Sequence, residues 1–308
     1  MKVVTLTLNP ALDIHYYLDN FKPFSENYAS LVSKSAGGKG INVSRALSML
    51  GVENEAVVVL GNDGADEFKE LLNRSDISYK AVYCDSKIRE NVTLHPQNDK
   101  ETRISLDTFS ITKETFAEAF ALADLKKGDI LVFAGRLPKG ICKEMVIEKL
   151  QELSKSGVLL AVDSNSFNPD DIKEISPWFV KPNSDEAKAL TGIDAEDLNS
   201  AYLAAVKLSC DYNIPNVLIS AGSEGAAFYG EYGGYSVLVP KISVVSTIGA
   251  GDSTVAGFVG AFYKNESVIE CLRTACASGT AACLSEGTEP PTEENFKKIK
   301  SQIEVIKN

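Results

Sequence analysis

Histidine and closely paired cysteines are scarce in this chain of 308 residues. It has two histidines, His15 and His95, and none of its six cysteines forms a Cys-x-x-Cys pair. Structural zinc sites are built from such residues at short spacings, so the sequence is poor material for zinc binding. A chain of this length can bury a large hydrophobic core, so it needs neither a structural metal nor disulfides to fold.

The chain also lacks an excess of positive charge and any long apolar run. Lys and Arg total 31 against 42 Asp and Glu, which gives a formal net charge of −11. Such a surface does not attract a nucleic-acid backbone or an anionic membrane. No uncharged apolar stretch approaches the roughly 18 residues of a membrane span, and the N-terminal segment is too short and polar for a signal sequence. We therefore predict a cytoplasmic protein with neither nucleic acid nor membrane as partner.

Apolar strands and amphipathic helices alternate along the chain. The strands are expected at residues 3–8, 55–60, 130–134, 158–163, 178–182 and 217–220. Apolar residues recur at helical spacing in residues 43–50, 146–153 and 255–262, and a polar terminal helix is expected after Pro290. Continuous apolar strands are typical of a sheet that is covered on both faces. The pattern predicts one three-layer α/β domain over residues 1–308 with a largely parallel sheet.

Two stretches interrupt this alternation. Residues 13–34 and 88–107 each contain short β-branched segments with no helical pattern between them. They predict antiparallel strands that form a small sheet beside the main domain, where it would serve as a lid over an active site. An ordinary surface excursion is the alternative that the pattern leaves open.

A glycine-rich loop precedes the first expected helix, in the sequence Gly37-Gly38-Lys39-Gly40. Glycines let the backbone approach a ligand closely, and the free amides of a helix N-terminus attract anions. Lys39 adds a mobile positive charge and Asn42 adds a hydrogen-bonding amide. The spacing is not that of a P-loop, and a tight turn without a ligand is the open alternative.

A second run of small residues, 247–251, comes just before the helix expected around residues 255–262. Free amides at residues 249–252 could form a cradle for an anion. Asp252, in the first turn, is either a residue that caps the helix or matches its dipole, or a general base aimed at a hydroxyl group. The positive helix end would keep this carboxylate ionised and a weak base. That suits phosphoryl transfer, which depends mainly on positioning and charge stabilisation.

Two further motifs follow expected strands. Asn183 and Glu186 are three residues apart, so they would share one face of a helix and could hold a hydrated Mg²⁺ with its phosphates. A helix-capping pattern is the equally open alternative. Residues 218–225 run from a strand into small residues, which is where an open α/β sheet places a nucleotide.

Together these motifs resemble the signatures of the ribokinase-like carbohydrate kinases, the phosphofructokinase-B family. The matching segments are residues 5–13, 37–46, 89–92, 134–138 and 247–258. The opening segment, the Arg-x-Asn-Val strand and the Gly-x-Leu-Pro turn are similar in particular to the branch of 1-phosphofructokinase and tagatose-6-phosphate kinase. The resemblance extends from Thr5 to about Gly287.

The resemblance implies a ribokinase-like α/β/α sandwich with a β-sheet lid, which in this family often pairs as a dimer clasp, so a homodimer through the lid is left open. It implies transfer of the γ-phosphoryl group of ATP to a sugar phosphate. D-fructose 1-phosphate, giving fructose 1,6-bisphosphate, is the expected substrate, and tagatose 6-phosphate, giving tagatose 1,6-bisphosphate, is the alternative.

Three other functions are less favoured. A kinase of unphosphorylated sugars would have no use for the cationic Lys39 and Arg89. A non-catalytic sugar-phosphate sensor would not need Asp252 beside an intact Gly-Ala-Gly turn. A dehydrogenase would carry Gly-x-Gly-x-x-Gly after the first strand, where Asn9-Pro10-Ala11 stands instead.

The same resemblance implies roles for individual residues. Asp252 would accept the proton of the sugar hydroxyl, and the amides of Gly249, Ala250 and Gly251 would form an anion hole. The expected substrate-binding residues are Asp13, Gly38 and Asn42 for the sugar hydroxyls, and Lys39, Arg89 and Arg103 for the existing phosphate. The expected nucleotide-binding residues are Asn183, Ser220, Gly222, Gly225, Ser278 and Gly279. Glu186, together with Asn183, would hold Mg²⁺ through water.

The sequence departs from the family pattern at a few positions near the expected site. Arg136 stands where the branch usually has Ser, so its charge faces either the sugar site or solvent. Residues 164–166 also differ from the usual Thr-Ser-Gly. These changes bear on the choice of substrate and leave the expectation of phosphoryl transfer intact.

Overall fold

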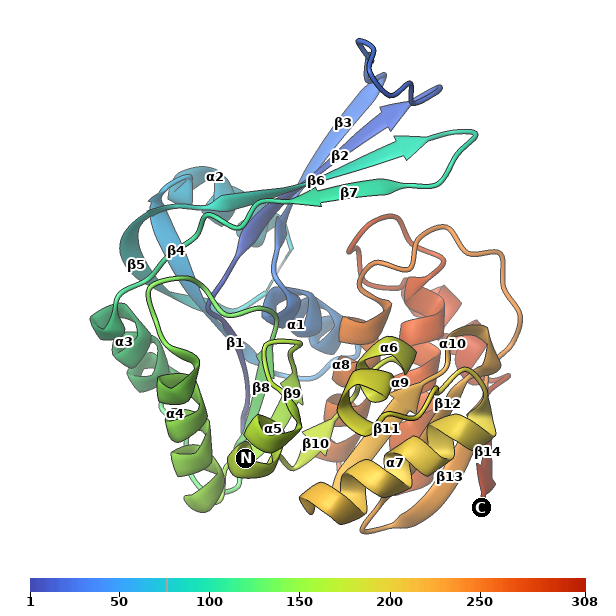
Figure 1. The fold of residues 1–308 in the computed structure, drawn as a ribbon. Coiled ribbons are helices and arrows are strands. Elements are labelled where there is room, and N and C mark those ends of the chain that lie inside the picture. Colours follow the sequence, from blue (N-terminus) through green and yellow to red (C-terminus); the bar gives the residue numbers. More distant parts are fainter. Residues whose placement is uncertain (76) are drawn as a thin grey trace.

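The computed structural model describes residues 1–75 and 77–308 and contains a ten-stranded sheet and a separate four-stranded sheet (Figure 1). In spatial order, the strands of the large sheet are β14 (Glu304–Lys307), β13 (Gly233–Leu238), β12 (Ala226–Gly230), β11 (Asn216–Ser220), β10 (Phe179–Val180), β9 (Leu159–Asp163), β8 (Ile130–Ala134), β1 (Val3–Thr7), β4 (Glu55–Asp63) and β5 (Tyr79–Lys87). From β11 to β5 neighbouring strands are parallel, whereas β12, β13 and β14 pair in antiparallel fashion. The expected largely parallel sheet is confirmed, and an unexpected antiparallel edge extends it.

Helices cover both faces of the large sheet. They are α1 (Lys39–Met49), α2 (Ala65–Arg74), α3 (Lys113–Ala123), α4 (Lys143–Lys155), α5 (Pro169–Ile175), α6 (Ser184–Thr191), α7 (Leu198–Tyr212), α8 (Ala250–Tyr263), α9 (Val268–Ala282) and α10 (Glu293–Lys300). One apolar cluster packs helices α3, α4, α5, α6 and α7 against one face of the sheet, and a second packs α1, α8, α9 and α10 against the other. This is the predicted three-layer arrangement. Within the described ranges, no helix is both long enough and apolar enough to cross a bilayer.

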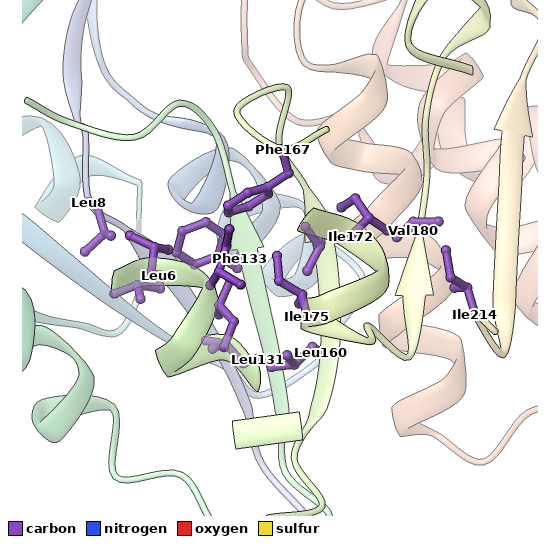
Figure 2. Packing of buried hydrophobic residues seen from close by; sticks show 14 of the residues in the cluster. Leu6, Leu8, Leu131, Phe133, Leu160, Phe167, Ile172, Ile175, Val180 and Ile214 are labelled. Atoms are coloured by element: carbon purple, nitrogen blue, oxygen red, sulfur yellow. The ribbon is translucent and has the colours of Figure 1, made fainter. Parts of the chain in front are cut away.

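Strand β8 shows why the central strands are apolar throughout. Its five residues, Ile130–Ala134, are all buried. Successive side chains of a strand point to opposite faces, so Leu131 and Phe133 enter one apolar cluster while their neighbours enter the other. Figure 2 shows Phe133 beside Phe167 on the face that α5 covers, and the ring centroids are 6.0 Å apart.

The four-stranded sheet, here called the small sheet, is built from both stretches that interrupt the alternation. Its order is β3 (Leu31–Gly37), β2 (Ala11–Leu18), β6 (Arg89–Pro96) and β7 (Thr102–Ser105). The two hairpins are antiparallel as expected, but the central pair β2 and β6 is parallel. The chain passes through α1, β4, α2 and β5 between these two strands, and such a long crossover permits parallel pairing.

The two faces of the small sheet differ in character. Leu12 and Ile14 pack into an apolar cluster with α1 and α2. Because side chains alternate along a strand, Asp13, His15 and Tyr17 of β2 lie on the opposite face. This polar face of the small sheet is the one that bears on the site described next.

Candidate functional site

A cavity of about 1060 Å³ opens at the carboxyl ends of the parallel strands, beside the small sheet. Its lining includes Thr7 at the end of β1, Ala134 at the end of β8, Asp163 at the end of β9, Lys181 just after β10 and Ser220 at the end of β11. Ligands of open α/β sheets bind at this edge. The cavity therefore occupies the position where the sequence motifs were expected to meet.

Asp252 lies buried in the first turn of α8, which begins after Gly249. In the part of the chain that the structure describes, no side chain caps this helix end. The Oδ2 atom of Asp252 instead accepts a hydrogen bond of 2.8 Å from Nδ2 of Asn42, and both residues line the cavity. The carboxylate thus makes no capping hydrogen bond and lines the cavity.

Burial raises the pKa of Asp252 to about 6. Lys39, Lys181 and the hydrogen bond from Asn42 oppose the rise, whereas the carboxylate of Asp163 adds to it. The expectation of a weak base held ionised by the helix end is therefore wrong in part, because burial outweighs these opposing effects. At pH 7 the group is still mostly ionised, but its pKa is close to the range in which a carboxylate is an effective proton acceptor.

A partly buried cluster of opposite charges surrounds this carboxylate. Nζ of Lys39 lies 3.1 Å from Oδ2 of Asp163, a side chain that is 3% exposed. Burial lowers the pKa of Lys39, but the carboxylates of Asp163, Asp252 and Glu186 outweigh it and raise the pKa above its usual value. In the same way Lys181 and Lys39 hold the pKa of Asp163 below its usual range despite burial. Lys39 and Asp163 therefore keep their charges at neutral pH.

Lys39 has a partner that the resemblance did not imply. Its Nζ is paired with Asp163, while both Lys39 and Arg89 line the cavity. Asp163 and Lys181 were not among the predicted site residues. Each of the two stands at the end of a parallel strand, which is the signal that could have identified them.

Small residues at the start of α8 form an open backbone turn on the cavity wall. Gly249, Ala250 and Gly251 all line the cavity. Gly249 has a φ of 80°, and a Cβ atom there would lie 3.4 Å from Cα of Thr288. The amide of Ala250 makes only a long contact of 3.4 Å with the Thr247 carbonyl. Amides in the first turn of a helix lack intrahelical acceptors, so this turn can bind an anion.

A hydrogen-bond network holds Arg89 at the junction of the small sheet and the cavity. Its Nε donates to Oδ1 of Asn9 at 2.7 Å, its Nη2 to the Asn9 carbonyl at 3.1 Å and its Nη1 to Oδ1 of Asn91 at 2.8 Å. Nδ2 of Asn91 in turn donates to Oδ1 of Asp13 at 2.6 Å. A Cβ atom at residue 37 would clash with the carboxylate of Asp13, so any other residue there would displace Asp13 from this network.

Two more guanidinium groups accompany Arg89. Nη2 of Arg103 lies 3.6 Å from Oδ1 of Asp13. Arg136 also lines the cavity, although it is exposed to solvent. Burial is the main cause that lowers the pKa of Arg89, and the positive charges of Arg103 and Arg136 act in the same direction. The three side chains form a cationic group suited to an anionic ligand.

The residues expected to bind a nucleotide lie mostly on the cavity wall. Those that line the cavity are Asn183, Ser220, Gly222, Gly225 and Gly279. Glu186, expected to hold Mg²⁺, and Gly38, expected to bind the sugar, line it as well. Ser278 does not line it, because its side chain is fully buried within α9 and its hydroxyl has no partner there. The motif around residue 279 therefore reaches the cavity through the glycine and not through the serine.

Asn183 and Glu186 form the helix-capping pattern that the sequence left open. Oδ1 of Asn183 accepts from the amide of Glu186 at 2.9 Å, and Oε2 of Glu186 accepts from the amide of Asn183 at 3.0 Å. Within the described residues, no group of three His, Cys, Asp or Glu side chains could hold a metal ion. A metal at Glu186 would therefore need water and ligand oxygens to complete its shell.

Comparison with known proteins agrees with this geometry. A model of the pfkB family of carbohydrate kinases matches residues 6–295. Tagatose-6-phosphate kinase of Staphylococcus epidermidis is 31% identical over 307 residues, which cover 99% of each chain. 1-Phosphofructokinase of Haemophilus influenzae is 32% identical over 278 residues, which cover 89% of this chain and 88% of the relative.

A solved structure is also similar over nearly the whole chain. Phosphofructokinase-2 from Escherichia coli in complex with substrates and products has a TM-score of 0.91 and 26% sequence identity. The match covers 98% of this chain and 99% of that one. The similarity therefore includes both the large sheet and the small sheet.

Proposed function

This chain belongs to the pfkB family of carbohydrate kinases, in the group of 1-phosphofructokinase and tagatose-6-phosphate kinase, and we propose that it phosphorylates D-fructose 1-phosphate with ATP. The family and the ribokinase-like fold expected from the motifs are confirmed. The chain is thus a phosphotransferase. The observation that carries the choice of a sugar phosphate is the group of three guanidiniums in the cavity that also holds Asp252.

The proposed reaction uses the groups around Asp252. The sugar hydroxyl loses its proton to the carboxylate of Asp252 while its oxygen bonds to the γ-phosphorus of ATP. The bond from that phosphorus to the bridging oxygen breaks, and ADP leaves with the electron pair. Oδ1 of Asn42 is buried without a partner, so it is available to accept a hydrogen bond from a sugar hydroxyl. The first amides of α8, with Lys39 and Lys181 nearby, stabilise the negative charge of the transferring group.

The cavity has room and donors for the nucleotide and its metal. Ser220, Gly222, Gly225 and Gly279 offer a wall of small residues for ATP. One carboxylate oxygen of Glu186 is used in the capping pattern, which leaves the other for a hydrated cation. Mg²⁺, when bound through water to this carboxylate, would neutralise charge on the phosphates of ATP.

The substrate is tested by measuring ADP release with fructose 1-phosphate, tagatose 6-phosphate, fructose 6-phosphate and the free sugars. We expect the highest kcat/KM for fructose 1-phosphate, by about tenfold or more, because a site that hydrogen-bonds a substrate's hydroxyl groups discriminates against sugars that present them differently. Tagatose 6-phosphate is the second candidate, because a relative with that activity aligns over 99% of both chains. The Asp252→Asn variant, purified in parallel, controls for contaminating kinases. Absence of activity on every sugar phosphate would overturn the proposal.

The pKa of Asp252 predicts the acid side of the pH profile. Because the carboxylate must be ionised to accept a proton and its pKa is raised to about 6, kcat/KM should fall about tenfold per pH unit below pH 6. Substrate phosphates titrate in the same range, so the acid limb of the pH profile does not by itself identify Asp252. A shift of this limb in a variant that changes the pKa of Asp252 identifies it instead. The hydrogen bond from Asn42 favours the ionised form. Asn42→Ala should therefore move the limb to higher pH with the same substrates, and an unmoved limb would assign it to another group.

A further inference from the structure

The two histidines of the chain form a cluster on the small sheet that does not line the cavity. Nδ1 of His15 lies 2.8 Å from Nε2 of His95, and the stacked rings have centroids 5.1 Å apart. The ring of Tyr17 stacks on the other histidine, His95, at 4.8 Å. His15 is 5% exposed. None of the three side chains has a part in the reaction proposed above.

This cluster is where the small sheet touches the segment that follows α9. The hydroxyl of Tyr17 donates to Oε2 of Glu286 at 3.0 Å. A Cβ atom at Gly287 would lie 2.9 Å from Cε1 of His15, so the imidazole rests directly on the backbone there. Tyr17 and His15 thus make both a polar contact and a close packing contact with residues 286–287.

The same segment supports the turn before α8. Thr288 lies next in the chain, and its Cα is 3.4 Å from the place where a Cβ of Gly249 would be. Segment 286–288 is therefore packed between the histidine cluster and the backbone turn that we assign to the transferring phosphoryl group. On the sheet side, Asp13 precedes His15 by two residues on β2 and shares its face.

We propose that His15, His95 and Tyr17 are positioning residues. They hold the small sheet, which carries Asp13 and Arg103, at a fixed distance from the anion-binding turn. The roles of Asp13, Arg103 and the turn rest on the proposed function. The contact itself, between the small sheet and segment 286–288, does not. The cluster acts through these neighbours and touches neither substrate nor nucleotide.

The hydrogen bond between the two imidazoles, which holds the ring of His15 against Gly287, is sensitive to protons. One ring nitrogen must donate and the other must accept, so the pair holds together only while at least one ring is neutral. Burial lowers the pKa of His15, and the positive charges of His95 and Arg103 act in the same direction, against Asp13 and Glu101.

The other charged group that faces the cluster is Glu286, which accepts the hydrogen bond from Tyr17. Glu101 approaches the far nitrogen of His95, with Oε2 3.7 Å from Nδ1. When the pH is low enough for both rings to be protonated, neither ring can accept a hydrogen bond and the two cations repel each other. The small sheet should then separate from segment 286–288.

Hydrogen exchange of the substrate-free protein tests this directly. Gln at position 95 stays neutral and can still donate to or accept from His15, so His95→Gln is the matched control. Near pH 8, the wild type and His95→Gln should protect residues 11–18 and 286–288 equally. Near pH 5.5, the wild type should exchange about fivefold faster than His95→Gln there, measured at the same pH so that intrinsic rates cancel.

Two further variants sharpen the exchange experiment. His15→Leu removes the pair and should exchange fast at both pH values, whereas Tyr17→Phe removes only the hydroxyl and should lie between it and the wild type. Equal protection in the wild type and His95→Gln at both pH values would overturn the proposal, as would wild-type protection in His15→Leu.

Kinetics supply a readout that a purely structural role would not move. The ratio of KM for fructose 1-phosphate in the wild type to that in His95→Gln should be near one at pH 8 and rise about threefold or more by pH 5.5. The ratio cancels the titration of Asp252 and of the substrate phosphate. KM for ATP should show no such rise. A ratio independent of pH counts against the cluster, whereas an inactive wild type counts against the proposed function and leaves the exchange result standing.

Discussion

Replacing Asp252 by Asn should lower kcat by about 10³-fold or more, since a positioned general base contributes roughly 10²–10⁴-fold and this carboxylate is also fixed by Asn42. The amide keeps the size of the carboxylate and can still accept the hydrogen bond from Nδ2 of Asn42. It cannot take the proton of the sugar hydroxyl at neutral pH. KM for both substrates should therefore stay within about threefold of the wild type. Steady-state kinetics with a coupled ADP assay measure all three constants.

The same variant should be more stable than the wild type at neutral pH. The folded-state pKa of Asp252 is about 6, above the usual aspartate value of 3.8, so the folded protein holds this proton more tightly than the unfolded chain. Its contribution to stability is thus full below pH 4 and is lost as the pH rises through 6. At pH 7 the ionised carboxylate costs about 3 kcal/mol, at roughly 1.4 kcal/mol per pKa unit.

Denaturant unfolding of both proteins near pH 7 and near pH 4 tests this sign. The stability gain of Asp252→Asn should be largest at pH 7 and shrink toward zero at pH 4. A variant that is inactive and also more stable locates the loss in the chemistry. Near-wild-type turnover would refute the role of Asp252 as the base, and a stability loss at pH 7 would refute the assigned pKa.

The central strands could be predicted because a strand that is buried on both faces consists of consecutive, mostly apolar residues. Every residue of β1 and β8 is buried, so β8 appears as an unbroken apolar run and β1 is interrupted only by threonines. The edge of the sheet leaves no such mark. Most of β14 is exposed, and its role depends on pairing with β13 some 70 residues earlier. The expected terminal helix is present as α10, but the strand after it could be recognised only from that pairing.

For the site, local motifs indicated the correct cavity but not the electrostatic partners. Glycines before α1 and α8 are detectable because the backbone requirement lies within a few residues. The ion pair between Lys39 and Asp163 joins residues 124 positions apart, so spacing carries no trace of it. The pKa of Asp252 depends mainly on burial by the whole fold. Only the helix end on which the residue stands can be recognised from the sequence, so this effect could not be predicted.

Arg89→Ala should raise KM for fructose 1-phosphate by about 10- to 100-fold while KM for ATP changes less than about twofold. A hydrogen bond to a charged group contributes about 1.5–3 kcal/mol, which corresponds to this range of affinity. Asn9 and Asn91 accept hydrogen bonds from all three nitrogens of the guanidinium. The side chain is therefore already oriented before the substrate binds and loses little conformational freedom on binding. Arg89→Lys keeps the charge but loses this fork, and should lie between the two.

The matched control is Lys87→Ala. Lys87 is exposed, lies outside the cavity and stands two residues before Arg89 in the chain, so the variant removes one positive charge near Arg89. It should leave both KM values unchanged, because an exposed charge is screened by solvent. Arg136→Ser should raise KM for the sugar phosphate less than Arg89→Ala does, since Arg136 is exposed and Arg89 is half-buried. An equal rise in both KM values for Arg89→Ala would show that this guanidinium organises the whole cavity. Selective loss of sugar-phosphate affinity assigns it to the phosphate that the substrate already carries.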